Sequence, residues 1–183
     1  METPELRFQP VYEDERGLFS AVSLWNINDR LMDKRWLQVN TSVSDHKYTL
    51  RGLHLQLEPF EQTKYLTVIK GKVLDFVVNC NEFSKDYGKI HVFEVDKDHA
   101  VYVPRGYAHG VLTLEDNTVL QYLTDNLYNP EKERSVLWSS VSGLEDIIKE
   151  YLPHFKPSYL TISEKDQNGI NFSDVKLYAP VVD

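Results

Sequence analysis

Short runs of alternating apolar and polar residues recur along almost the whole chain and constrain its fold more than any other feature. The clearest case is Tyr65–Lys70, which is followed by Gly71-Lys72 and then by Val73–Val78. Two such runs joined by a glycine-containing turn are typical of a β-hairpin. Further runs are Leu6–Tyr12, Leu18–Trp25, Trp36–Ser44, Tyr48–Gln56, Lys89–Val95, Ala100–Pro104, Val111–Leu114, Val119–Thr124 and Ser135–Trp138. Because the strand-then-helix rhythm of a parallel sheet is missing, the pattern predicts an all-β sandwich or barrel.

One helix is predicted near the end of the sequence. The segment Gly143–Tyr151 places four apolar side chains on one face, and Pro153 ends it. The 183 residues suffice for one domain, and they contain no internal repeat or low-complexity linker. We expect a single domain over 1–183, with a core at about 8–140 and a C-terminal helix and tail over 141–183.

The balance of charge and the single cysteine limit the partners and the compartment. The formal net charge is −8, from 20 basic and 28 acidic residues, which disfavours binding to nucleic acid and to anionic membranes. No apolar stretch reaches the ~18 residues that span a bilayer, and the first residues, METPELRF, do not resemble a signal peptide. Cys80 lies in an apolar run and is expected to be a small buried residue. The expected setting is the cytoplasm.

The first group of chemically informative residues lies in the segment Arg51–Gln56. On an extended strand, Gly52, His54 and Gln56 share one face. Lys64 shares a face with the apolar residues of the following strand. If both faces point into a barrel, a histidine and a lysine meet in a partly apolar cavity.

The second group is Pro104-Arg105-Gly106-Tyr107-Ala108-His109-Gly110. The spacing Pro-x-Gly-x-x-His resembles the second motif of the cupin superfamily, in which the turn aims the histidine into the barrel. A metal-binding cupin would here use His54, Gln56, Glu61 and His109. Glutamine is a poor ligand for Zn, Fe or Ni, but three ligands can suffice. Spacing alone therefore leaves open both a metal site and hydrogen-bonded core histidines, and Tyr122 alone would indicate packing.

Taken in order, the motifs resemble the dTDP-4-dehydrorhamnose 3,5-epimerase family. The resemblance runs from about Phe8 to Trp138, with a further patch at Ser163–Asp166. Its pieces are Asp14-Glu15-Arg16-Gly17, Gln38-Val39-Asn40-Thr41-Ser42, Arg51-Gly52-Leu53-His54, Gln62-Thr63-Lys64, the Pro104–Gly110 segment, Tyr122 and Tyr128. Each piece is weak alone, but their order and spacing are highly specific.

The resemblance implies a cupin jelly-roll barrel, a homodimer with exchanged N-terminal strands, and no metal or cofactor. It implies a nucleotide-linked 4-keto-6-deoxy sugar as substrate, inverted at C3, C5 or both, in the synthesis of activated sugars for surface polysaccharide. The implied catalytic roles are His54 as base, Asp166 as its carboxylate partner, Lys64 beside the substrate oxygen and Tyr122 as general acid. The implied substrate-binding residues are Arg16 and Arg51 at phosphate, Tyr128 at the nucleotide or sugar, and Gln38, Asn40 and His109 along the pocket.

Elementary acid–base chemistry agrees with these roles. A C–H bond beside a ketone is weakly acidic, and a neutral imidazole can accept its proton near neutral pH. The developing enolate needs a fixed positive charge, which Lys64 could supply in a water-poor site. Inversion requires reprotonation from the opposite face, so the acid must be a second residue such as Tyr122.

Two departures from the family pattern concern the nucleotide. Ala21 stands where the family commonly has a glutamate near the base, and Trp138 is followed by an unusual helix. We therefore hypothesise a GDP-linked substrate, possibly a 6-deoxy-heptose, as an alternative to a dTDP-linked one. The competing functions are a nucleotide-sugar ketoisomerase, a metal-dependent cupin enzyme and a sugar-binding cupin without catalysis.

Overall fold

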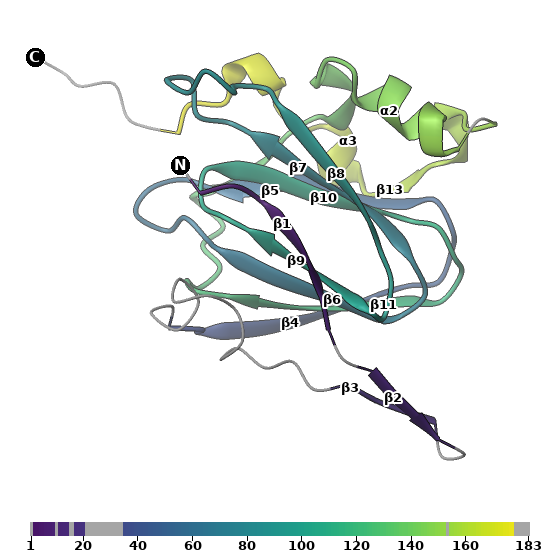
Figure 1. Cartoon of the computed structure of the whole chain (residues 1–183). Helices are drawn as coiled ribbons and strands as arrows, with labels where there is room; N and C mark the ends of the chain where they lie inside the picture. Colours follow the sequence, from purple (N-terminus) through teal and green to yellow (C-terminus); the bar gives the residue numbers. More distant parts are fainter. Residues whose placement is uncertain (1, 10, 15–16, 21–34, 153, 178–183) are drawn as a thin grey trace, which may run out of the picture.

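The barrel is built from two sheets that face each other (Figure 1). The computed structural model describes residues 2–9, 11–14, 17–20, 35–152 and 154–177. The first sheet contains, in spatial order, β1 (Glu5–Phe8), β9 (His99–Val103), β6 (Lys64–Lys70), β11 (Thr118–Thr124) and β4 (Gln38–Ser44). The second contains β12 (Glu133–Ser135), β5 (Thr49–Gln56), β10 (Tyr107–Thr113), β7 (Val73–Asn79) and β8 (Ile90–Val95). These neighbours are antiparallel, and the all-β class is confirmed.

A separate hairpin of β2 (Val11–Asp14) and β3 (Gly17–Ser20) projects from the barrel (Figure 1). The predicted run Leu6–Tyr12 is thus divided between β1 and β2. Of the predicted run Leu18–Trp25, the part after residue 20 lies outside the described residues. The hairpin carries apolar side chains away from the barrel core.

The apolar residues form clusters on both faces of the second sheet. Inside the barrel, Val73 and Val77 of β7 pack with side chains of the first sheet such as Leu66. The intervening residues of β7, including Phe76, pack outward. Every residue of β7 is buried, because the C-terminal segment covers the outer face. A charged residue on the inner face of this strand, such as Asp75, is therefore fully enclosed.

The C-terminal segment wraps over the second sheet and returns to its edge (Figure 1). Its elements are η2 (Trp138–Ser140), α2 (Leu144–Tyr151), η3 (Pro157–Tyr159), β13 (Thr161–Ile162), α3 (Glu164–Gln167) and η4 (Phe172–Asp174). The predicted helix is confirmed, and it buries Leu144 and Ile148. Strand β13 pairs in parallel with β5. Ser163 caps α3 by accepting the backbone N–H of Asp166, which brings this carboxylate beside β5.

Two predicted boundaries were wrong in instructive ways. The predicted strand Val111–Leu114 is β10 (Tyr107–Thr113), which begins four residues earlier, directly after the turn at Arg105–Gly106. The predicted strand Ser135–Trp138 shares only Ser135 with β12 (Glu133–Ser135), because the chain then turns into η2 over the edge of the sheet.

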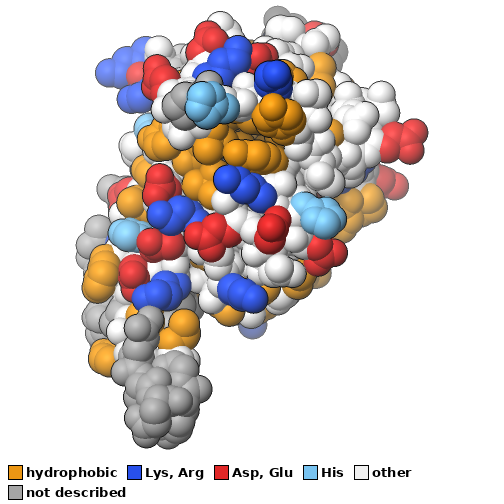
Figure 2. Space-filling model, turned by 90° about the vertical axis from the view of Figure 1, so that its right-hand side faces the viewer, with side chains coloured by type: hydrophobic (Ala, Val, Ile, Leu, Met, Phe, Trp, Pro, Cys, Tyr) orange, Lys and Arg blue, Asp and Glu red, His pale blue; other side chains and the backbone are white. Residues whose placement is uncertain are grey.

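Charged side chains of both signs are interspersed on the face of the molecule seen in Figure 2. The acidic surplus of the sequence is therefore not gathered into one field on that face. Within the described ranges, no helix combines the length and apolar character needed to cross a bilayer.

Candidate active site

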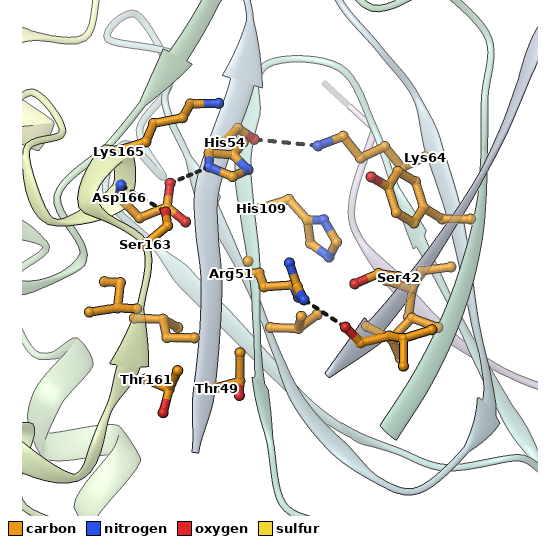
Figure 3. A pocket seen from close by; sticks show the side chains of 18 of the residues that line it. Ser42, Thr49, Arg51, His54, Lys64, His109, Thr161, Ser163, Lys165 and Asp166 are labelled. Atoms are coloured by element: carbon orange, nitrogen blue, oxygen red, sulfur yellow. Dashed lines mark hydrogen bonds and ion pairs between the residues drawn. The ribbon is translucent and has the colours of Figure 1, made fainter. Parts of the chain in front are cut away.

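A cavity of about 710 Å³ lies between the two sheets (Figure 3). The second sheet contributes Arg51 and His54 from β5 and His109 from β10. The first sheet contributes Lys64 and Tyr122. A smaller lobe of about 380 Å³ shares His54, Lys64 and Tyr122 with it. The residues that the sequence predicted as catalytic thus line one space, including Asp166.

A bulge in β5 decides which of its side chains face this cavity. In the pairing with β10, His54 lies opposite His109, whereas Arg51 lies opposite Val111, so β5 carries an extra residue between these pairs. Gly52 sits in the bulge with φ +114°, and a Cβ there would lie 2.7 Å from the Cα of Gly110. Arg51 and His54 therefore both line the cavity, which simple alternation did not predict.

His54 is held by Asp166, as the family resemblance implied. The distance from His54 Nε2 to Asp166 Oδ1 is 2.6 Å. Asp166 also accepts hydrogen bonds from Ser135 Oγ at 2.8 Å and from the backbone N–H of Gly52 at 3.1 Å. Although burial raises the pKa of Asp166, these hydrogen bonds and the His54 charge outweigh burial and hold it well below its usual range. The ionised carboxylate fixes the proton on Nε2 and leaves the lone pair on Nδ1.

Lys64 and Tyr122 occupy the opposite sheet. Tyr122 pairs with Leu66 and Thr124 pairs with Lys64, so Lys64 and Tyr122 are diagonal neighbours on one face. Lys64 Nζ lies 3.5 Å from the carbonyl oxygen of His54, which joins the two walls. The base and the acid that the sequence predicted therefore stand on opposite sides of the cavity.

Burial shifts the pKa of both groups on this wall. Desolvation lowers the pKa of Lys64 to about 8, and the nearby charges of Glu133 and Asp75 offset only part of that effect. Lys64 is half-buried: protein atoms surround most of its side chain, and the remaining surface faces the cavity. Burial raises the pKa of Tyr122, partly opposed by Arg51. Near neutral pH the site thus holds an ammonium group and a protonated phenol.

A second histidine–carboxylate pair lies one strand away. His109 Nε2 is 2.8 Å from Asp75 Oδ2, and Asp75 is completely buried. Asp75 Oδ1 has no hydrogen-bond partner among the residues that the structure describes. His109 lines the cavity, as the resemblance implied, and it is also a hydrogen-bonded core residue, one of the two interpretations that its spacing left open.

The other predicted substrate contacts divide into two groups. Gln38, Asn40 and Tyr128 line the smaller lobe, where Gln38 Nε2 donates to Asn40 Oδ1 at 2.6 Å and Gln38 Oε1 accepts the Tyr128 N–H at 3.0 Å. Arg51 lines the main cavity and donates to the carbonyl of Val43 at 2.7 Å. Arg16 lies outside the described residues, as does Ala21.

Two of the residues considered for a metal site, Gln56 and Glu61, do not line the main cavity. Both polar ends of the Gln56 amide bind loop backbone, at Phe60 O (2.5 Å), Leu127 O (3.1 Å) and Asn129 N (2.6 Å). Glu61 does not line either lobe. Within the described part of the chain, no three side chains of His, Cys, Asp or Glu are grouped as metal ligands. Cys80 is buried, and burial raises the pKa of its thiol to about 12.

Sequence reasoning missed four polar residues of the site. Asp75 was hidden in an apolar run, although a lone carboxylate on a buried strand signals a buried partner. Glu133 and Lys165 line the smaller lobe, where Glu133 accepts hydrogen bonds from Lys165 and from the Tyr128 hydroxyl. Ser135 gave no signal, because its role depends on a strand pairing with β5.

Comparison with known proteins agrees with this geometry. Residues 6–174 match the family described as dTDP-4-dehydrorhamnose 3,5-epimerase. An enzyme of that name from Shigella flexneri is 34% identical over 179 residues, covering 94% of this chain and 93% of its own length. The crystal structure of dTDP-4-dehydrorhamnose 3,5-epimerase from Elizabethkingia anophelis has 32% identity and a TM-score of 0.77, with 96% of this chain and 93% of that chain covered.

A third relative was solved with a sugar nucleotide. The crystal structure of dTDP-6-deoxy-D-glucose-3,5-epimerase from Legionella pneumophila, in complex with dTDP-4-keto-L-rhamnose, has 25% identity and a TM-score of 0.77. It covers 94% of this chain and 89% of that chain. The expected cupin-type barrel is confirmed by these structural neighbours.

Proposed function

We infer that the cavity of this chain, which belongs to the dTDP-4-dehydrorhamnose 3,5-epimerase family, inverts carbons beside the ketone of a nucleotide-linked 4-keto-6-deoxy sugar. As a member of that family the chain is a sugar-nucleotide epimerase, an isomerase. The assignment of roles to individual side chains is our proposal.

The proposed reaction begins at His54. Its Nδ1 lone pair removes the proton from C3 or C5 of the sugar, and the electron pair moves into the ketone to form an enolate. Asp166 stabilises the imidazolium through Nε2. The ammonium group of Lys64 stabilises the enolate oxygen in the enclosed cavity.

In the second half of the reaction, the proton comes from Tyr122 on the first sheet, opposite His54. Tyr122 delivers its hydroxyl proton to the other face of the planar carbon, and the enolate collapses to the ketone with the configuration inverted. The phenolate regains a proton from solvent as His54 loses one, so the protein returns to its starting state. Arg51, with a guanidinium on the cavity, is proposed to bind phosphate.

One observation carries this proposal: a histidine oriented by a carboxylate and a protonated tyrosine line the same cavity from opposite sheets. Binding alone requires neither an oriented base nor an opposed acid. Lys64, which lies close to both, supplies the charge that a proton abstraction beside a ketone needs.

For the nucleotide we propose dTDP, with GDP as the alternative to be tested. Relatives with a dTDP-linked ligand, such as the Legionella enzyme, support dTDP. The GDP and heptose hypothesis rests on Ala21, which lies outside the described residues, and on the helix Leu144–Tyr151 that follows Trp138.

The test is solvent-deuterium incorporation into dTDP- and GDP-linked 4-keto-6-deoxy sugars, followed by NMR at C3 and C5. We expect incorporation with the dTDP-linked sugar. Incorporation with the GDP-linked sugar only would replace the nucleotide assignment. A folded protein that exchanges neither position in either sugar would refute the proposed function.

We further propose a homodimer in which N-terminal strands are exchanged. The hairpin β2–β3 projects from the barrel and exposes Tyr12 and Phe19, which stack on each other. The outer face of the first sheet exposes Val39 and Val43. A second copy would cover both surfaces. Sedimentation should give a dimer for the wild type and a monomer for Phe19→Glu, whereas a wild-type monomer would refute this proposal.

The expected partners are thus the sugar nucleotide and a second copy of the chain. The cytoplasm remains our proposal for the compartment, and the one cysteine in the sequence, a buried thiol at Cys80, is consistent with a reducing environment.

A further inference from the structure

Strand β12 brings a hydroxyl group to the carboxylate that holds His54. In the antiparallel pairing of β12 with β5, Ser135 lies directly opposite His54. Ser135 Oγ is 2.8 Å from Asp166 Oδ1. His54 Nε2 is 2.6 Å from the same oxygen atom. One carboxylate oxygen therefore accepts two hydrogen bonds, one from the histidine and one from the serine.

The rest of the carboxylate is held independently of Ser135. Asp166 Oδ2 accepts the N–H of Gly52 at 3.1 Å, and the backbone N–H of Asp166 is capped by Ser163. The cap and the Gly52 contact hold Asp166 at the edge of β5 through atoms other than Oδ1. The Ser135 hydroxyl, in contrast, binds Oδ1, the oxygen atom that contacts His54, and so it can change the charge that His54 experiences.

We propose that Ser135 is a positioning residue of this epimerase, which acts through Asp166 to extend to lower pH the range in which His54 is free to take the proton of the substrate. This inference rests on the proposed role of His54 as the base. Nothing in the sequence motifs assigns a role to Ser135.

The physical argument concerns the charge on Asp166 Oδ1. A carboxylate next to an imidazole favours the imidazolium, which has no lone pair left to accept a proton. The O–H dipole of Ser135 points its positive end at the same oxygen and so opposes that effect. It contributes to the low pKa of Asp166. Without it, the pair would bind its proton more tightly.

Other titratable or charged groups line the two lobes around the pair, and a change at Ser135 alone leaves them in the protein. They are Arg51 from β5, Lys64 from β6, His109 from β10, Tyr122 from β11, Glu133 from β12 and Lys165 from α3. A change in the titration of the pair in a Ser135 variant is therefore attributable to the lost hydroxyl group.

The experiment compares Ser135→Ala with Ser135→Thr, which keeps a hydroxyl group, and with Ser140→Ala as a matched control. Ser140 lies in the same segment, and its hydroxyl also forms hydrogen bonds, to Leu137 O and from Phe172 N. The first readout is the pH profile of kcat/KM for exchange into dTDP-4-keto-6-deoxyglucose. The second is NMR titration of the labelled His54 ring in the free protein, which requires no substrate.

We expect Ser135→Ala to move the acidic limb of the profile, and the midpoint of the ring titration, upward by about half to one pH unit. Its rate should fall about three- to tenfold on the acidic side and recover at higher pH, with little change in KM. Ser135→Thr should restore both midpoints, and Ser140→Ala should leave them unchanged.

Two results would overturn the inference. One is a Ser135→Ala protein whose rate falls equally at every pH with an unmoved ring titration, which is what a merely structural serine would give. The other is a variant identical to the wild type. Failure of the proposed function is a separate outcome: it would appear as no exchange in the wild-type protein, and failure of the base assignment as full exchange in His54→Ala, whatever the Ser135 variants do.

Discussion

The two histidine–carboxylate pairs of this barrel are neighbours, yet they are built for different tasks. His54 and His109 face each other in the pairing of β5 with β10, and each contacts its carboxylate through Nε2. The side chain of His54 is 28% exposed, whereas that of His109 is 7% exposed. Asp166 arrives from the C-terminal segment, while Asp75 sits inside the barrel wall with 0% exposure.

The difference teaches what a proton-transferring pair requires. Asp166 has further donors from Gly52 and Ser135, so its charge is stable and the imidazole keeps an accessible lone pair. Asp75 has one oxygen without a partner in the described part of the chain, so its charge depends on His109. The first pair is suited to accept a proton from substrate, and the second ties two strands together at the floor of the cavity.

The largest expected effect is a loss of epimerisation rate when the carboxylate of the His54 pair is removed. Asp166→Ala should lower kcat/KM by about 10²- to 10⁴-fold, because His54 loses the group that orients it and stabilises its charged form. Steady-state epimerisation together with thermal unfolding would measure it. A variant with full stability and at least a third of wild-type kcat/KM would show that Asp166 is not the partner of a catalytic base.

The next effect is a loss of folding stability when the carboxylate of the His109 pair is removed. Asp75→Ala should destabilise the fold by about 3 kcal/mol, because it leaves His109 buried without its partner. In a chain of this length that corresponds to a fall in Tm of about 6–12 °C. Its kcat/KM, measured well below the new Tm, should change less than tenfold. A variant that is as stable as wild type but inactive would reverse the roles assigned to the two pairs.

The smallest effect is a pH dependence from the wall that faces both pairs. Since burial lowers the pKa of Lys64 to about 8, its ammonium form is present below that pH and is lost as pH rises through it. The pKa of Tyr122 is raised, so the acid stays protonated over that range. The rate should therefore fall by up to about tenfold per pH unit above 8. In Lys64→Arg, whose guanidinium stays charged, this alkaline limb should disappear, and its persistence would assign the limb to another group.

The residues of the reacting centre could be found in the sequence because each lies in a short, ordered motif. Strand periodicity brought His54 and Lys64 together, whereas Tyr122 and Asp166 were implied only by the family resemblance. The bulge at Gly52 was not predictable from alternation, because it depends on the close approach of Gly110 on another strand. Arg51 therefore lines the cavity because of a shift in strand register, which the local sequence pattern does not predict.

The supporting residues could not be predicted for a related reason. Ser135 and Asp75 act only through strand pairing and burial, which are set by contacts far away in the sequence. The strand predicted at Val111–Leu114 was too short, because the alternating pattern is not visible at Tyr107–Gly110, where the pairing with β7 continues the strand up to the turn at Arg105–Gly106. Motif order thus identified the proposed catalytic residues better than the residues that support them.

The most direct test of the account is position-resolved exchange in deuterated water with His54→Ala and Tyr122→Phe, using dTDP-4-keto-6-deoxyglucose. The account predicts that His54→Ala neither exchanges nor inverts. It predicts that Tyr122→Phe still incorporates deuterium, because His54 can return a proton to the same face, but inverts at least about a hundredfold more slowly. Full exchange in His54→Ala, or inversion at the wild-type rate in Tyr122→Phe, would contradict it.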